Sequence, residues 1–361
     1  MATLSISFFK VFQMNNAKIG VLLINLGTPD NCDPRSVYDY LQQFLNDPRV
    51  IALPAIMRYI LVNCFIIPLR YKQSAQAYSQ IWTDKGSPLL LHSQELVNAV
   101  RTAFDKTIQI ELGMRYGHPN IQSAVDKLQK CQKIIAIPLF PQYSSAATGS
   151  AIDELLRVLG KQWNIPEISI KRDFFDNPDF IHAYSCLIKE HLKDQKIDAF
   201  IFSYHGLPER HITKSACLSL CSKLEPCSQV DQLNMYCYRA QCYETSRLMA
   251  KELNLSSQDY VVAFQSRLGR TPWIKPYTDL MLADLRQKNV NNIAIVCPSF
   301  VADCLETLEE INIRARYQWL SLGGHEFIFI PCLNAYSIWV EAVIKMIKSQ
   351  VSCNHEKCVL N

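Results

Sequence analysis

The chain has 361 residues, and its 49% hydrophobic and 19% charged content supports a buried core and excludes an intrinsically disordered protein. At roughly 150 residues per domain, this length predicts two domains. Lysine and arginine number 37 and aspartate and glutamate 33, and a net charge of +4 is too small to indicate a nucleic-acid partner. The few glycines form no dinucleotide-binding fingerprint, no phosphate-binding loop and no hydrolase nucleophile elbow. The sequence therefore gives no support to the protein classes that these three motifs identify.

Residues 1–17 lack the features of a secretory signal. They carry a single basic residue, Lys10, and only a short apolar patch, Ile6–Phe9. We expect a ragged or disordered start, with translation from Met1 or Met14, and a cytoplasmic protein at most peripheral to the inner face of a membrane.

The most apolar stretch is Val50–Leu69. It has about the length of a membrane span, but Arg58, Pro54 and Pro68 interrupt it. A spanning helix is therefore disfavoured. A buried helix, and a helix at a membrane surface or at the lip of an apolar pocket, remain equal alternatives.

Short β-branched runs alternate with amphipathic stretches along the chain, which is typical of βαβ units. The predicted strands are Ile19–Asn25, Ile134–Pro138, Ala199–Tyr204, Tyr260–Gln265, Asn292–Cys297 and Phe327–Ile330. The predicted helices are Ser93–Phe104, Ile121–Lys130, Ile152–Leu159, Asp179–Leu192 and Ala240–Leu253. Because the strands are apolar throughout, both faces of each sheet are expected to be covered, as in parallel α/β sheets.

A weak internal repeat indicates two similar α/β domains facing a shared cleft. The strand and turn at Val21–Asp30 resemble those at Ala199–Glu209, and each half later has a strand that runs into proline. We expect domains at 18–165 and 166–345 and a tail at 346–361, with the boundary lying between Gly160 and Asp176. Ligands of such sheets bind beyond the carboxyl ends of the strands.

Two of these strand ends carry residues suited to proton and metal chemistry. His205 follows one strand and precedes a Gly-x-Pro turn, which favours exposure of its ring. After another strand, Asp303 could cap a helix on which Glu306 and Glu310 lie four residues apart. A carboxylate line for protons or a divalent cation and a solvated acidic helix start are equal interpretations from these residues alone.

Five of the 14 cysteines crowd into one segment. They are Cys217, Cys221, Cys227, Cys237 and Cys242. Their spacing matches neither a paired zinc motif nor a ferredoxin run, but thiols this close favour a soft metal or a cluster. An iron–sulfur cluster is the favoured interpretation of this segment, and a zinc site or free thiols are the alternatives.

Residues from Gly20 to about Val343 resemble the ferrochelatase family, which completes haem synthesis. Six segments carry the resemblance in the same order: Asn25–Asp30, Arg115–Ile121, Pro138–Ser150, Ser203–His211, Phe264–Asp279 and Pro298–Ile311. The resemblance implies two Rossmann-like domains with parallel sheets around a central porphyrin cleft. It implies a lyase that inserts ferrous iron into protoporphyrin IX, and it makes porphyrin and iron the expected partners.

The resemblance also assigns roles to individual positions. His205 and Glu306 match the catalytic, iron-handling pair, with an imidazole on one face of the macrocycle and a carboxylate on the other. Further positions match residues that line the pocket or hold its hydrogen bonds: Arg115, Tyr116, Tyr143, Trp273 and Asp303. Glu310 extends the row of carboxylates that begins with Glu306 and is a further candidate metal ligand. This chain departs from the family at Cys304, where histidine is frequent, and at Arg314, which interrupts the acidic line.

Further family features concern the substrate, a cofactor and the lip. Leu26 stands where members that metallate coproporphyrin tend to carry tyrosine, which favours protoporphyrin. Some members bind a 2Fe-2S cluster. The insertion at 214–240 offers four cysteine ligands for one: Cys217, Cys221, Cys227 and Cys237. The pair Cys353 and Cys358 is a competing source of ligands. Such a cluster would be structural or sensory. The segment 50–69 would form the pocket lip and contact a membrane.

Two rival functions follow from the same residues. The first is a chelatase for another metal or tetrapyrrole, such as cobalt or coproporphyrin. The second is a non-catalytic tetrapyrrole-binding redox sensor. The sequence leaves the oligomeric state open.

Overall fold

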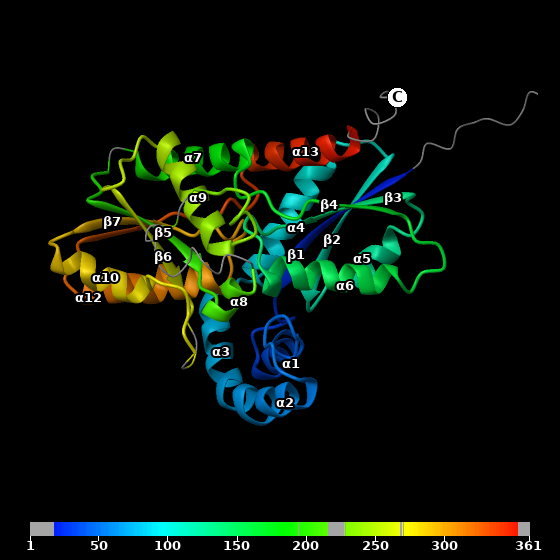
Figure 1. Ribbon diagram of the computed structural model, residues 1–361, viewed down its shortest axis with the longest axis horizontal. Helices are drawn as coiled ribbons and strands as arrows, with labels where there is room; N and C mark the ends of the chain where they lie inside the picture. Colours follow the sequence, from blue (N-terminus) through cyan, green and yellow to red (C-terminus); the bar gives the residue numbers. More distant parts are fainter. Residues whose placement is uncertain are drawn as a thin grey trace, which may run out of the picture.

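The computed structural model describes residues 18–193, 195–215, 227, 229–267, 269 and 271–352 as two parallel four-stranded sheets with helices around them (Figure 1). The first sheet has the order β2-β1-β3-β4: β1 (Ile19–Gly27), β2 (Ile108–Tyr116), β3 (Lys133–Pro138) and β4 (Glu167–Ile170). The second has the order β6-β5-β7-β8: β5 (Ala199–His205), β6 (Tyr260–Gln265), β7 (Asn292–Val296) and β8 (Glu326–Phe329). The identical strand order confirms the predicted duplication.

The central strands are apolar because helices cover both of their faces. In β1, every side chain from Val21 to Asn25 is buried, and β1 pairs in parallel with both β2 and β3. In the second sheet, β5 is buried from Ala199 to Tyr204 and holds the equivalent position between β6 and β7. The apolar runs that predicted strands therefore correspond to the middle of each sheet.

Helices connect the strands. The longer ones are α1 (Pro34–Leu45), α3 (Ile67–Ile81), α4 (Pro88–Arg101), α6 (Ser150–Leu159), α7 (Pro178–Leu192), α9 (Tyr238–Glu252), α10 (Thr278–Gln287) and α13 (Ser337–Ser352). The shorter ones are α2 (Ala55–Ile60), α5 (Ile121–Lys127), α8 (Glu209–Thr213), α11 (Leu305–Thr307) and α12 (Arg316–Ser321). Three segments have the wider π-helical winding: η1 (Leu61–Ile66), η2 (Ser145–Gly149) and η3 (Leu308–Ala315).

Two strands were missing from the sequence prediction. β2 contains Glu111, which interrupts its apolar pattern, but this carboxylate is buried beside Arg101 at 3.3 Å and Lys127 at 3.4 Å. β4 is a short, half-exposed edge strand that pairs with β3 from Lys133 to Ala136. Because β4 belongs to the first sheet, the strands of the first domain extend to Ile170, which lies within the range Gly160–Asp176 expected for the boundary.

One hydrophobic core joins the two domains. Val21 of β1 belongs to the same buried cluster as Phe202 of β5 and Val296 of β7. The C-terminal helix α13 packs against α7 and α4, and its Trp339 ring lies 5.6 Å from that of Phe174 (Figure 1). α13 runs to Ser352, so the first residues of the segment 346–361, expected to be a tail, continue this helix and bury Met346 and Ile347.

The apolar stretch Val50–Leu69 is neither a buried helix nor a membrane span. It forms α2, η1 and the start of α3, which project away from the sheets in Figure 1. Between Val50 and Leu69, only Val62 and Ile67 are buried, whereas Ile56 is 77% and Leu69 81% exposed. Within the described residues, no helix is long and apolar enough to cross a bilayer.

Candidate functional site

A cavity with about 1090 Å³ of empty space lies where the carboxyl ends of the central strands of both sheets meet. Each of these strands contributes lining residues at its end: Leu26 and Thr28 at β1, Leu139 and Phe140 after β3, His205 and Leu207 at β5, and Ser299 and Phe300 after β7. The cavity therefore confirms the rule that ligands of parallel sheets bind beyond the strand ends.

His205 is held with one ring nitrogen available. Its backbone N–H donates to Ser299 Oγ at 3.1 Å, and its carbonyl accepts from the hydroxyl of Tyr238 at 2.8 Å. Its Nδ1 lies 2.6 Å from the carbonyl oxygen of Gly206. Because a carbonyl only accepts, Nδ1 carries the proton, and the lone pair of a neutral His205 is on Nε2.

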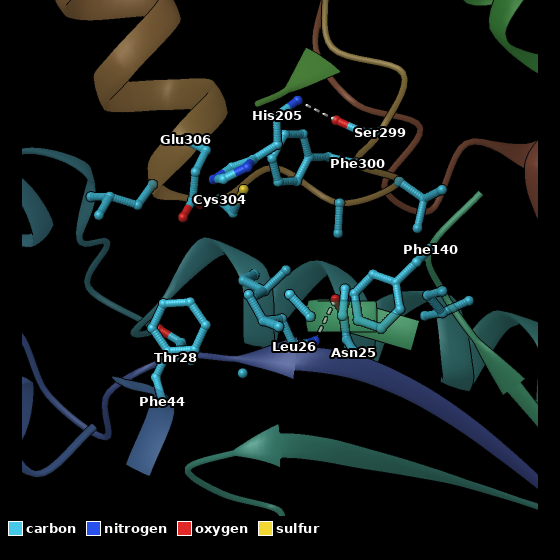
Figure 2. A pocket seen from close by; sticks show the side chains of 18 of the residues that line it. Asn25, Leu26, Thr28, Phe44, Phe140, His205, Ser299, Phe300, Cys304 and Glu306 are labelled. Carbon is cyan, nitrogen blue, oxygen red and sulfur yellow. Dashed lines mark hydrogen bonds between the residues drawn. The ribbon is translucent and has the colours of Figure 1, made fainter. Parts of the chain in front are cut away.

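Glu306 lines the same cavity from the short helix α11. The start of this helix is fixed by Thr307, whose hydroxyl accepts from the Cys304 N–H at 3.0 Å and donates to Asp303 at 2.9 Å. Figure 2 shows Glu306 and His205 on one side of the cavity and Leu26 and Phe44 on the other. Both side chains thus approach the cavity from the C-terminal domain, whereas the resemblance implied that they face a macrocycle from opposite sides.

Asp303 does not line the cavity, although it holds the loop that does. Its carboxylate accepts from Asn334 Nδ2 at 2.8 Å and from the Cys332 N–H at 3.2 Å, in addition to Thr307. Asp303 is only 4% exposed, so these hydrogen bonds compensate a buried charge. The sequence prediction that Asp303 caps the helix is close, but the N-cap residue is Cys304. Burial and the neighbouring Glu306 raise the pKa of the Cys304 thiol, which therefore stays protonated.

Glu310 does not line this cavity. It lines a separate, smaller cavity, where its carboxylate accepts from the Ser266 N–H at 2.7 Å and the Ser266 hydroxyl at 2.5 Å. Burial raises the pKa of Glu310, and these hydrogen bonds only partly offset that effect. Since residues 308–315 have π-helical winding, Glu306 and Glu310 do not follow the spacing of one α-helical face. Arg314 pairs with Glu309 at 2.8 Å, not with Glu310.

Arg115 and Tyr116 lie outside the cavity and share one buried carboxylate. Asp47 Oδ2 accepts from Arg115 Nη2 at 2.6 Å, from the Tyr116 hydroxyl at 2.9 Å and from the Ser150 hydroxyl at 2.5 Å. Burial alone would raise the pKa of Asp47, but the hydrogen bonds from Ser150, Arg49 N–H and Tyr116, with the charge of Arg115, lower it overall. Arg115 therefore fixes the wall behind the site.

Tyr143 and Trp273 also lie outside the lining of this cavity. Tyr143 lines a second large cavity, and the Arg172 guanidinium lies 5.1 Å from the centre of its ring. Trp273 supports the site indirectly, because its ring centre lies 6.4 Å from that of His205 and its segment pairs with Pro208. Of the seven residues that the resemblance assigned to catalysis or substrate binding, the structure brings only His205 and Glu306 together in the cavity.

Several lining residues were not predicted, because they come from helices instead of strand ends. Tyr40 and Phe44 lie on α1, and Tyr78 and Ile81 on α3. The Tyr40 hydroxyl donates to the carbonyl oxygen of Gly27 at 3.2 Å, which fixes the backbone beside Leu26. The aromatic residues of α1 and α3 are the available signal, but without the fold they are typical core residues.

The cysteine-rich segment is only partly described. Cys217 and Cys221 lie outside the described residues, as do Cys353 and Cys358. Cys227 and Cys237 are both buried in the shared core, at 7% and 0% exposure. In the part of the chain that the structure describes, no group of three or more metal-ligating side chains is placed to hold a metal ion.

A family model and similar known proteins agree on one family. A family model described as ferrochelatase matches residues 18–351. A protein named ferrochelatase from Legionella pneumophila (strain Corby) is 54% identical over 332 residues, covering 92% of this chain and 99% of that protein. The chain belongs to the ferrochelatase family. Another member, from Coxiella burnetii (strain Dugway 5J108-111), is 50% identical over 355 residues, covering 97% of this chain and 99% of that member.

The fold of this ferrochelatase-family chain also occurs in solved structures. SirB from Bacillus subtilis, solved with Fe3+, has a TM-score of 0.53 at 10% identity and covers 93% of this chain and 96% of its own. The sirohydrochlorin chelatase SirB from Bacillus subtilis subspecies spizizenii, solved in complex with cobalt, has a TM-score of 0.52 at 9% identity over 92% of this chain and 94% of its own. At such low identity, the likeness shows the fold alone.

The Asp47 network yields a prediction about stability. Asp47→Asn leaves the Arg115 guanidinium, whose side chain is 19% exposed, without its charged partner, and we expect the free energy of unfolding to fall by about 3 kcal/mol. Urea denaturation at pH 7 measures this change. Because the pKa of Asp47 is lowered in the folded state, its contribution is present above the ordinary carboxyl range and is lost as the pH falls through the folded-state pKa.

Asp39→Asn is the matched control, since Asp39 is exposed and pairs only with Arg35 on the same helix at 3.2 Å. This variant should change stability by less than about 0.5 kcal/mol. Equal effects of the two substitutions would contradict the structural role of Asp47.

Proposed function

We propose that the protein is a ferrochelatase that inserts ferrous iron into protoporphyrin IX to give protohaem, a lyase that completes haem synthesis. One observation carries the proposal: in a chain of the ferrochelatase family, His205 and Glu306 converge on one large cavity at the strand ends of both sheets. The cavity walls are otherwise mostly apolar or aromatic, including Phe44, Phe140 and Phe300. Such walls suit an apolar macrocycle.

His205 supplies the base. Insertion of Fe2+ releases both pyrrole N–H protons, so a group that accepts protons must face the ring nitrogens. The neutral His205 has its lone pair on Nε2, because Nδ1–H donates to the Gly206 carbonyl. The same hydrogen bond would also stabilise the imidazolium that forms after proton transfer. Two protons leave for each iron that enters, so His205 must pass its proton on before the second transfer.

Glu306 supplies the negative charge for the incoming ferrous ion, which is a substrate in this reaction. Carboxylate oxygen and imidazole nitrogen are both suitable ligands for Fe2+. Since Glu306 and His205 both belong to the C-terminal domain, they would meet the iron on one face of the porphyrin. The apolar groups of the N-terminal domain, among them Leu26 and Phe44, would then press on the opposite face. Such pressure favours a bent macrocycle, which presents its nitrogens to the metal.

The choice of protoporphyrin rests on Leu26. This side chain faces the cavity from the end of β1 and offers no hydroxyl at the position where coproporphyrin-metallating members tend to have tyrosine. An apolar floor fits the vinyl-bearing porphyrin better than a more carboxylated one. The neutral thiol of Cys304 adds a soft atom to the wall but no base.

We also infer that helices α2, η1 and α3 touch a membrane surface. Their exposed apolar side chains lie on one projecting arm: Ile56, Met57, Tyr59, Ile60, Phe65 and Leu69. The same arm supplies Tyr78 and Ile81 to the cavity. A bilayer dissolves apolar porphyrins, so this arm would bring the cavity close to the substrate. The protein would then be peripheral to the membrane.

The cysteine-rich segment is proposed to bind a 2Fe-2S cluster through Cys217, Cys221, Cys227 and Cys237. The two members of this set that the structure describes are buried in an apolar core, which suits thiolates that must be shielded from water. A cluster bound there would supply a structural link or a redox signal, because metal insertion transfers no net electrons. Cys242 is the spare thiol, and burial raises its pKa well above the ordinary range.

The first test concerns His205. His205→Ala should abolish formation of protohaem while protoporphyrin still binds, because the cavity walls remain but the base is lost. Absorption spectra of the anaerobic protein, before and after addition of ferrous iron and protoporphyrin, measure both properties. His325→Ala, at an exposed position, is the matched control. Metallation that survives in His205→Ala would refute the role of His205; binding without metallation in the wild type would favour a silent tetrapyrrole-binding protein.

The second test concerns the membrane. Leu69→Glu should weaken binding to sedimented vesicles of a phosphatidylglycerol and phosphatidylethanolamine mixture by about tenfold or more, since a charge replaces an apolar group that the membrane would bury. Trp163→Glu changes another exposed residue, at 98% exposure, outside the projecting arm and serves as control. If both variants sediment like the wild type, the arm does not bind membranes.

The third test concerns the cluster. Anaerobically purified protein should show visible charge-transfer absorption and contain about two irons and two sulfides per chain. Cys237→Ser should remove that absorption, whereas Cys131→Ser, at a buried position in the N-terminal domain, should retain it. A colourless wild-type protein without sulfide would exclude the cluster.

A further inference from the structure

A second cavity lies behind one wall of the first. Residues that follow β3 alternate between the two: Ser144 and Ala146 line the first cavity, whereas Tyr143 and Ser145 line the second. The second cavity contains about 1130 Å³ of empty space and is wide open to solvent. None of the chemistry proposed for iron insertion uses it.

Cations from separate parts of the chain line this second cavity. Arg172 is held between two aromatic rings, with its guanidinium 5.1 Å from the ring centre of Tyr143 and 4.5 Å from that of Tyr236. Its Nε and Nη2 donate to Asp173 at 2.9 and 2.6 Å, which leaves Nη1 without a hydrogen bond to the described residues. Lys214 lines the cavity and has no ion pair with any part of the chain that the structure describes.

A third cation, Arg49, reaches the cavity while paired with Asp153 at 3.2 Å. Among the described lining residues there is no carboxylate. The described lining therefore carries three cations and no carboxylate, although Asp153 and Asp173 pair with two of the cations from outside it.

His211 is an independent observation. Both of its ring nitrogens are buried and have no hydrogen-bond partner within the described residues, although the side chain lines the cavity. Burial lowers the pKa of His211, and the nearby charges of Arg210 and Lys214 lower it further. The ring is therefore neutral at pH 7 and carries one N–H donor that lacks an acceptor. Buried polar groups in folded proteins normally have partners, and a turn of the ring towards the cavity would let this N–H reach an anion there.

We propose that the second cavity binds a small oxyanion with more than one negative charge, inorganic phosphate or a short polycarboxylate. Lys214 and the free Nη1 of Arg172 would supply charged hydrogen bonds, and His211 would donate through its unpartnered N–H. Tyr143 and Tyr236 belong to the same lining. Because the bound anion would contact the back of the segment 143–147, it could adjust the wall of the first cavity. This site would bind neither porphyrin nor iron, and it does not rest on the proposed chelatase activity.

Calorimetric titration of the full chain with phosphate or citrate, at constant ionic strength set with sodium chloride, tests the proposal. We expect saturable binding of at least one anion, and the two titrations identify phosphate or a polycarboxylate as the ligand class. Lys214→Gln should weaken that binding about tenfold, as the loss of one charged hydrogen bond would. His211→Phe keeps a ring in place without its nitrogens and should also weaken it.

Lys288→Gln removes the same charge from an exposed site at the end of α10 and is the matched control. Neither iron nor porphyrin is present in the titration, so a failure of the chelatase proposal would not affect the result. No saturable binding of either anion would overturn the proposal. Equal weakening by Lys214→Gln and Lys288→Gln would also overturn it, because the effect would then reflect net charge alone.

Discussion

The site depends on one constraint: the two parallel sheets must be fixed so that the carboxyl ends of their central strands face each other. The shared core achieves this, because side chains of β1, β5 and β7 belong to one buried cluster. Helix α13 reinforces it by packing against α4 of the first domain and α7 of the second. The position of His205 relative to the apolar wall at Leu26 thus follows from packing far from either residue.

Because of this arrangement, the two domains contribute different kinds of side chain to the cavity. The C-terminal domain carries His205 and Glu306, the groups proposed to handle protons and metal, and the N-terminal domain carries the apolar wall opposite them. The hydrogen bond from His205 Nδ1–H to the Gly206 carbonyl selects the tautomer that leaves Nε2 unprotonated. Asp303 and Thr307 fix the start of the helix that presents Glu306. Residues that do not touch the cavity therefore determine its chemistry.

Sequence reasoning recovered most of the fold because the central strands are continuous apolar runs with clear ends. It missed β2 because Glu111 breaks the pattern, and only the fold shows that Arg101 and Lys127 neutralise that charge. The rule about strand ends located the cavity and made His205 and Glu306 candidates, and the family resemblance assigned them catalytic roles. Arg115 could not be assigned from sequence, because an arginine in a motif can bind a ligand or, as here, a buried carboxylate.

Other parts of the site depend on contacts between distant segments. Tyr40 and Tyr78 reach the cavity from helices whose aromatic residues look like ordinary core. Hydropathy alone could not show that the segment at 50–69 turns its apolar side chains outward, since buried and surface-seeking helices have the same composition. The π-helical winding after Thr307 directs Glu310 into a different cavity, and an assumed α-helical spacing hides that change.

The central claim is that this cavity exchanges two pyrrole protons for one ferrous ion. The most direct measurement follows the visible spectrum of the wild-type protein under anaerobic conditions, with protoporphyrin and limiting ferrous iron, alongside proton release in weakly buffered solution. The account predicts that porphyrin bands convert to haem bands, with close to two protons released per haem formed. Porphyrin that binds and keeps its free-base spectrum in the presence of ferrous iron would contradict it.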